Sequence, residues 1–301
     1  MNVFLNGHHV DANVEMQGAT TTDSAGGQAD ISEIILPDTA LVNSWEITRG
    51  MTLKIEHRGY SSGEMHIDEM EEKANGTVVI RAVSLSEAAK VKQWGCYENI
   101  TLGELLRRGA SALGLKYALY GVNPNTLLRR IVQRDQTWPA FLAMVFRNES
   151  ATIKFDNDTI LAIDYGWAFT QNPARVMQVD EKPRYFQRPK FHSARVRSGL
   201  VEGKAIDASV PGNMHKDIHN DQVYSDQQAT RAAKGVLMQA NLDSEVYRRK
   251  IPLDTSIAAM SRIDLFGHPR IAGNWFVDSV THDIKNETSD LTMKRCITTI
   301  K

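Results

Sequence analysis

The sequence is poor in cysteine. Cys96 and Cys296 are the only two among 301 residues, and they lie far apart in the chain. This excludes a disulfide framework and a cysteine-based zinc knuckle, although one disulfide stays formally possible. Two free and largely buried thiols in a reducing compartment are the expected state.

Long apolar runs and targeting signals are also missing. No run approaches the roughly 18 apolar residues that a membrane-spanning helix needs. The N-terminal segment MNVFLNGHHV lacks the basic and apolar regions of a secretory signal. We therefore expect a chain that is made in the cytoplasm and stays soluble there until it assembles with something.

Neither sign of charge dominates. The chain has 35 Lys and Arg against 36 Asp and Glu, for a net charge of −1. A strongly basic nucleic-acid surface is therefore not indicated, although a local patch is not excluded. Hydrophobic content of 42% and charged content of 24% are those of an ordinary globular protein. The length suggests about two domains.

Catalytic motifs are largely absent. The sequence has no Gly-x-Ser-x-Gly elbow, no phosphate-binding glycine loop and no zinc spacing. His215 and His219 could bind a metal if helical, but they follow Pro211-Gly212 without the glutamate of a metalloprotease, which favours a solvated loop. The carboxylates of Asp68–Glu72 could serve glycoside cleavage, but an exposed acidic turn is the favoured interpretation. We predict no catalytic residue, no cofactor-binding residue, no cofactor and no metal ligand.

The sequence does contain an internal repeat. The stretch Arg262–Ile297 predicts three β-segments, and Leu53–Ser84 predicts three in the same order. Gly63–Met70 matches Gly273–Val280 as Gly-x-apolar-x-Ile/Val-Asp-x-apolar. A duplicated β-module is therefore the working hypothesis.

Helical signals lie between the β-segments. Thr101 and Glu104 form a capping box before an apolar helical face, and a second helix is predicted after Thr137. Small polar residues predict a mobile loop over Gln17–Asp30, and an irregular stretch is expected over Glu202–Asp221.

These signals predict a mainly β fold with inserted helices (α+β), built as two similar barrels or sandwiches. The proline-containing segment Gln171–Pro189 marks the boundary between the halves. The expected division is a first β-domain over 1–88, completed by a hairpin at 151–165, a helical insertion over 89–150, and a second β-domain over 166–301 with an inserted helix at 226–242.

The order of these pieces resembles the phage late-control D, or baseplate hub, family. The resemblance rests on Trp45–Gly50, Gly63–Met70, the helices after Thr101 and Thr137, and the closing Gly273–His282. It implies two tube-type β-barrel domains with a small helical insertion. Three such chains would form a trimeric ring of pseudo-sixfold symmetry that joins a tail tube to a central spike.

The resemblance also implies a location and partners. The protein would be a late structural component of the virion, at the tail baseplate or tip, assembled in the host bacterial cytoplasm. Its partners would be itself, the tail tube protein, the central spike protein and other baseplate or tail-tip proteins, with DNA only in transit through the channel. The residues expected at packing positions or subunit interfaces are Trp45, Gly50, Gly63, Gly273, Trp275 and His282.

Two alternatives remain. A distal-tail or receptor-binding adaptor on a related β-barrel predicts hexamers or surface-glycan binding. A cell-wall glycan hydrolase would use Asp68–Glu72.

Overall fold

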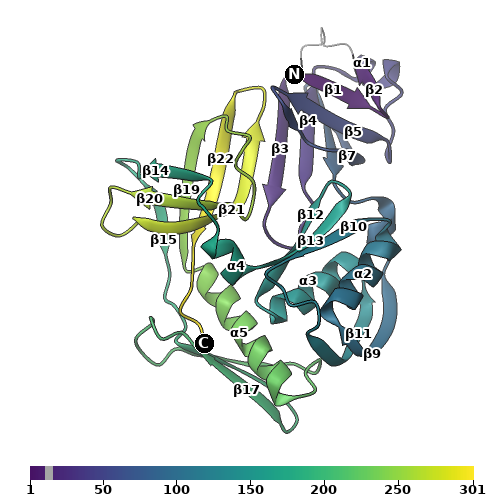
Figure 1. Ribbon diagram of the computed structural model, residues 1–301. Helices are drawn as coiled ribbons and strands as arrows, with labels where there is room; N and C mark the ends of the chain where they lie inside the picture. Colours follow the sequence, from purple (N-terminus) through teal and green to yellow (C-terminus); the bar gives the residue numbers. More distant parts are fainter. Residues whose placement is uncertain (11–15) are drawn as a thin grey trace.

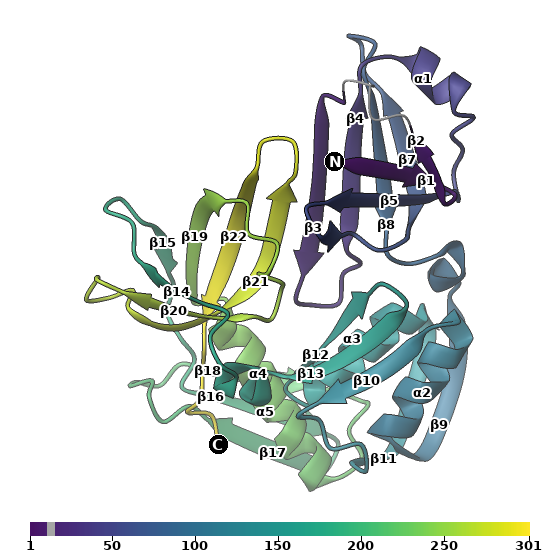
Figure 2. The same ribbon diagram turned by 45° about the horizontal axis from the view of Figure 1, so that its top comes forward.

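The computed structural model describes residues 1–10 and 16–301. Its architecture is mainly β, with two sheet modules lying above two smaller α/β units in the view of Figure 2. Fourteen strands from both modules form one continuous sheet (Figure 1). Within the described part of the chain, no helix is long and apolar enough to cross a membrane.

Module 1 packs a curved sheet over an aliphatic core that includes Leu53, Ile55 and Ile80. Apolar and polar residues alternate along its strands, so that one face of each strand enters the core. Its elements are β1 (Asn2–Leu5), β2 (His8–Val10), β3 (Gly18–Ser24), β4 (Ile31–Leu36), α1 (Thr39–Ser44), β5 (Thr52–His57), β6 (Tyr60–Ser61), β7 (Met65–Glu72), β8 (Val78–Val83) and the 3₁₀ turn η1 (Glu87–Lys90).

Module 2 has the same kind of curved sheet around Trp275 and Tyr247, both fully buried. Its order is β15-β19-β22-β21-β20-β14, and β14 pairs in parallel with β20. Its strands are β14 (Arg175–Gln178), β15 (Arg184–Gln187), β19 (Glu245–Pro252), β20 (Arg262–Phe266), β21 (Gly273–Asp283) and β22 (Thr288–Arg295).

The first α/β unit lies between the modules in sequence. Thr101 caps α2, its hydroxyl accepting from the Glu104 N–H at 3.2 Å, and Thr137 caps α3 in the same way. Leu105, Phe141 and Phe146 bury the two helices against a three-stranded sheet. The elements are β9 (Gln93–Thr101), α2 (Leu102–Leu113), β10 (Lys116–Tyr120), β11 (Leu127–Gln136), α3 (Trp138–Asn148), β12 (Ala151–Asp156), β13 (Thr159–Asp164) and α4 (Tyr165–Thr170).

The second α/β unit is inserted between β15 and β19. The predicted helix at 226–242 is α5 (Asp226–Leu242), and its alanine face packs closely on β16 (Ser193–Ser198) and β17 (Val201–Ile206). The strand β18 (His215–His219) completes this sheet beside β16. A Cβ added to Gly203 would lie 2.1 Å from the Thr230 nitrogen, so only glycine allows this approach of helix and strand. Another Cβ at Gly235 would lie 2.1 Å from the Arg147 carbonyl, where α5 meets α3.

The duplicated module is confirmed at the level of strand register. Leu53 pairs with Met65 in module 1, and Ile263 pairs with Trp275 in module 2, both 210 positions later. Each long strand then carries a register shift at its aspartate, between Ile67 and Glu69 and between Val277 and Ser279. Such a bulge bends and twists the strand. The matched pattern of the sequence is therefore a matched structure, bulge included.

The expected closed barrels are not formed by the described residues. The sheet runs openly from β15 at one edge to β2 at the other. The physical reason is that β3, the strand available to close module 1, pairs instead with β21 of module 2. The hairpin expected to complete the first barrel, β12–β13, pairs with β10 in a separate sheet. Its only β-bridge to module 1 among the described residues is the isolated one between Phe155 and Ala29.

Three segments expected to lack regular structure contain strands. Residues 17–30 hold β3, residues 171–189 hold β14 and β15, and residues 202–221 hold most of β17 and all of β18. The threonines of β3 suit a pleated and half-buried strand, which a composition-based interpretation as a loop overlooks. Both cysteine thiols are free, as expected. Cys96 lies on β9 and is exposed, whereas a buried thiol was expected.

Candidate assembly interface

The two modules are joined edge to edge by β3 and β21. Ser279–Asp283 pair antiparallel with Ser24–Thr20, and the hydroxyls of Thr22 and Thr281 lie 2.9 Å apart across the junction. The bulge at Asp278 makes this possible, because the first half of β21 pairs with β20 while the second half bends away to reach β3. The junction is a pairing of strand edges from two similar modules.

A buried charge cluster lies at the end of this junction. The Lys154 ammonium of β12 is 2.6 Å from Asp23 Oδ1, and the other Asp23 oxygen accepts from the Ala259 N–H at 2.8 Å. Asp30 Oδ1 accepts from the Ser24 N–H at 3.1 Å. Through these contacts the cluster ties module 1, module 2 and the first α/β unit to one another.

Burial makes the Asp30 carboxyl a weaker acid and thereby gives protein stability a dependence on pH. Desolvation, followed by the nearby Asp23 carboxylate, raises the pKa of Asp30 to about 8. The carboxyl is therefore mostly protonated in the folded protein at pH 7, and it becomes mostly ionised only above about pH 8.

Replacing Asp30 by asparagine is expected to remove one pH dependence of stability. Between about pH 4 and pH 8 the unfolded state has released the Asp30 proton and the folded state keeps it. Stability from this group therefore falls as pH rises, by up to about 1.4 kcal/mol per unit. In urea unfolding at pH 5, 6, 7 and 8, the free energy of unfolding of Asp30→Asn minus that of wild type should increase with pH. Parallel pH profiles for the two proteins would contradict the assignment.

Trp275 and His282 lie inside the sheets. Trp275 is 0% exposed, its indole N–H donates to the Ile271 carbonyl at 2.8 Å, and the Arg295 guanidinium lies over its ring. His282 is 3% exposed, lies 2.9 Å from the Ser289 hydroxyl and packs edge-on against Tyr60. Burial lowers the pKa of His282, so this side chain is neutral at physiological pH.

Of the other predicted residues, three are glycines in turns and one, Trp45, caps the C-terminal end of α1. Gly50, Gly63 and Gly273 all have positive φ, at 87°, 72° and 127°. At Gly63 a Cβ would lie 1.4 Å from the Asn157 amide oxygen, where module 1 meets the first α/β unit. Trp45 is half-buried, ends α1 and packs on the core of module 1.

The residues considered for chemistry are not arranged for it. Asp68 is paired with Lys90 and Arg49, and these cations lower the pKa of its carboxyl, whereas a general acid needs a raised pKa. Glu69 is held by Arg81 at 2.7 Å. His215 and His219 lie on the strand β18, and the described residues contain no group of three or more potential metal ligands.

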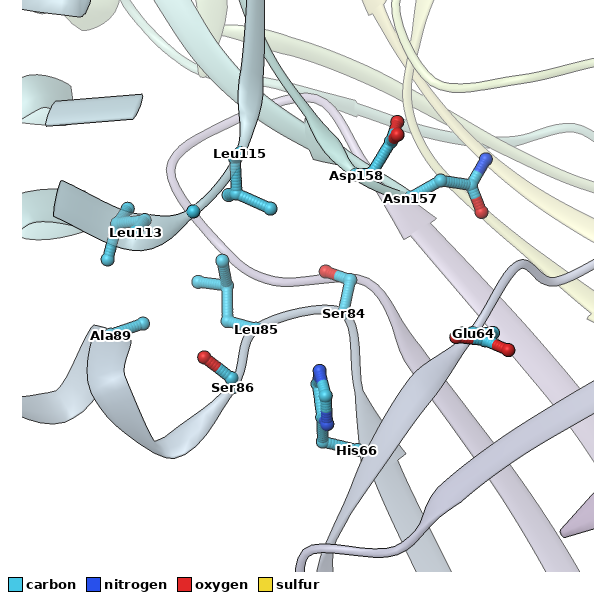
Figure 3. A pocket seen from close by; sticks show the side chains of 11 residues that line it. Glu64, His66, Ser84, Leu85, Ser86, Ala89, Leu113, Leu115, Asn157 and Asp158 are labelled. Carbon is cyan, nitrogen blue, oxygen red and sulfur yellow. The ribbon is translucent and has the colours of Figure 1, made fainter. Parts of the chain in front are cut away.

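A cavity of about 340 Å³ lies between module 1 and the first α/β unit (Figure 3). Its wall includes His66, Ser84 and Ser86, residue types that could form a nucleophile and its base. Within the described chain no hydrogen bond joins His66 to either serine, and the Ser84 hydroxyl instead accepts from the Asp30 N–H at 3.0 Å. Polar and apolar side chains line the cavity about equally, and its described residues hold no assembled catalytic pair.

The charge cluster was missed at the sequence level. Asp23 and Asp30 stood in the segment interpreted as a loop, and Lys154 stood in a hairpin. The internal repeat gave no signal for them, because it covers 53–84 and 262–297 and includes none of the three residues.

Comparison with known proteins begins with sequence. No protein-family model matches the chain, and no curated protein matches its sequence. Solved structures do match.

Three solved structures illustrate the likeness. The prophage MuSo2 43 kDa tail protein from Shewanella oneidensis has a TM-score of 0.75 at 10% identity, over 98% of this chain and 97% of that one. The tail protein from Neisseria meningitidis MC58 has a TM-score of 0.73 at 12% identity, over 98% and 96%. The E. coli c3393 protein, described as a type VI secretion component with structural similarity to T4 bacteriophage tail proteins gp27 and gp5, has a TM-score of 0.58 at 10% identity, over 97% and 76%. Along almost its whole length, this chain therefore has the fold of phage tail proteins.

Proposed function

We propose that this protein is a structural hub of a phage or phage-like tail, in which three copies form a ring of pseudo-sixfold symmetry. The observation that carries the proposal is the duplicated module, whose two copies match in register and bulge and are joined edge to edge. Three chains then present six similar modules, which suits an adaptor between a sixfold tube and a threefold spike.

The division of labour follows from the same arrangement. Residues 1–88 and 166–301 would supply the two ring-building halves, and the α/β unit between them would lie outside the repeat. The tail-protein fold supports a virion location in the baseplate or tail tip. The proposed partners are the tail tube protein, the central spike protein and other tail-tip proteins, with DNA in transit. The proposed role is structural and not enzymatic.

The test is the mass of the assembled protein. Mass photometry of the full chain, alone and with its spike or tube partner, is expected to show a species of about 100 kDa, three times the 33.7 kDa of one chain. Monomers alone under every condition would overturn the ring. A species of six chains would instead support the distal-tail adaptor.

A further inference from the structure

Two strands occupy the places in their modules that β3 and β21 occupy at the internal junction. Within the described chain, each of them has one edge with no strand beside it. One is the second half of β7, Glu69–Glu72, which pairs only with β8. The other is β15, which pairs only with β19. An open edge presents unpaired N–H and C=O groups to any strand that can align with it.

We propose that β15 of one copy pairs antiparallel with the second half of β7 of another copy, repeating between chains the junction that β3 and β21 make within one. The proposal rests on the proposed ring and gives it a residue register.

The register follows from the repeat. β3 lies beside β4, and β15 lies beside β19, at matching places in the two modules, so Thr20–Ser24 correspond to 184–188. On the other side, 279–283 of β21 correspond to 69–73. Transferring the observed pairs then sets the contacts of the new junction, which are Glu69 with Arg188, Met70 with Gln187, Glu71 with Phe186, Glu72 with Tyr185, and Lys73 with Arg184.

Opposite charges meet in this register. Tyr185 faces the core of module 2, so Arg184, Phe186 and Arg188 point to the other face. On that face Glu69 comes opposite Arg188, and Glu71 comes between the two arginines. Opposite charges on paired strands stabilise the pair, and the one like-charged pair, Lys73 with Arg184, has Glu71 as its diagonal neighbour.

The surroundings of β15 reinforce the match. A groove of about 580 Å³ beside it carries more basic than acidic residues; its charged members are Lys182, Arg184, Arg248, Arg249 and Lys250, with Asp180 and Asp290. The Arg248 guanidinium lies 5.7 Å from the Phe186 ring centre.

Apolar surface marks both edges as well. Phe186 is 55% exposed on β15, and Met70 is 39% exposed on β7. In the proposed register the two side chains lie on adjacent residue pairs and therefore on opposite faces, where each would pack beside the neighbouring strand.

The position of the edges fits a closed ring. β15 lies at the left of the molecule in both views, and β7 belongs to the module at the upper right (Figures 1 and 2). Different surfaces at opposite sides make a heterologous contact, which generates a ring when the rotation closes. The β3–β21 junction within chains and the β7–β15 junction between chains would then alternate around the trimer.

Cysteine cross-linking of the full chain tests the register. In a Cys96→Ser background, Glu71→Cys with Phe186→Cys places two Cα atoms at the spacing of directly paired antiparallel residues, about 4.5–5.5 Å, within the disulfide range. Mild oxidation is expected to give covalent dimers and trimers on a non-reducing gel. The matched control, Glu71→Cys with Arg184→Cys, is shifted by two residues and should give at most about a tenth of that product.

A charge reversal supplies an independent readout. Arg188→Glu is expected to weaken assembly at least about tenfold by mass photometry, since like charges directly opposite destabilise a strand pair. Adding Glu69→Gln to the same chain removes the repulsion without placing a second cation opposite Arg81, and should restore part of the assembly. Glu98→Arg, on the exposed strand β9, is the control and should leave assembly unchanged.

The outcomes separate this inference from the ring itself. Trimers that form normally, with no more product from the paired cysteines than from the shifted pair and no rescue of Arg188→Glu by Glu69→Gln, would overturn the β7–β15 contact and leave the ring standing. Monomers under every condition, with the spike or tube partner present, would overturn both. Register-specific cross-links together with rescue establish the contact.

Discussion

Replacing Trp275 by alanine is expected to lower the free energy of unfolding by about 3–5 kcal/mol, the usual cost of removing a large buried aromatic side chain. The ring is fully buried and lies 6.1 Å from Tyr247 and 6.2 Å from Tyr185 between ring centres. Removing it leaves a cavity under β19 and β15 and an unsatisfied Ile271 carbonyl. Urea unfolding followed by far-ultraviolet circular dichroism measures the change.

Two variants sharpen this expectation. Trp275→Phe keeps an aromatic ring but loses the indole hydrogen bond, so a smaller cost of about 1–3 kcal/mol is expected. Trp94→Ala removes a tryptophan that is 74% exposed and should change stability by less than about 0.5 kcal/mol. A Trp275→Ala protein as stable as Trp94→Ala would contradict the packing role. Because Tyr185 belongs to β15, the Trp275 core also supports the edge proposed to join a second chain.

The sequence predicted the elements better than their connections. The pattern Gly-x-apolar-x-Ile/Val-Asp-x-apolar carried enough information to align two strands whose pairing and bulge then proved to match. The cap at Thr101 was readable because a hydroxyl three residues before a free N–H is a local signal. Local signals of this kind can be read from the sequence without knowledge of the fold.

Which edge pairs with which was not readable. Whether β3 closes its own module or joins β21 depends on a bend produced by the bulge and on contacts far apart in the chain. The same is true of Asp23 and Lys154, whose pairing joins segments separated by more than a hundred residues. Small residues and threonines around Asp23 looked like a loop because composition does not report that a neighbouring strand will bury them.

Replacing Lys154 by methionine is expected to destabilise the protein by about 3–5 kcal/mol, because the change leaves a carboxylate without its buried partner. The Lys154 side chain is 6% exposed and that of Asp23 is 16% exposed, so water replaces little of the lost interaction. The matched control is Lys116→Met, which breaks the exposed pair with Asp158 and should cost no more than about 1 kcal/mol.

A second substitution tests whether the cost comes from the stranded charge. Asparagine at position 23 keeps an oxygen that can accept from the Ala259 N–H, so Lys154→Met with Asp23→Asn should recover at least half of the loss. A cost below about 1 kcal/mol for Lys154→Met, or a double variant as unstable as the sum of the singles, would contradict the pairing. Because Asp23, Ala259 and Lys154 lie on three different units, recovery would also show that one buried charge pair fixes how the modules meet.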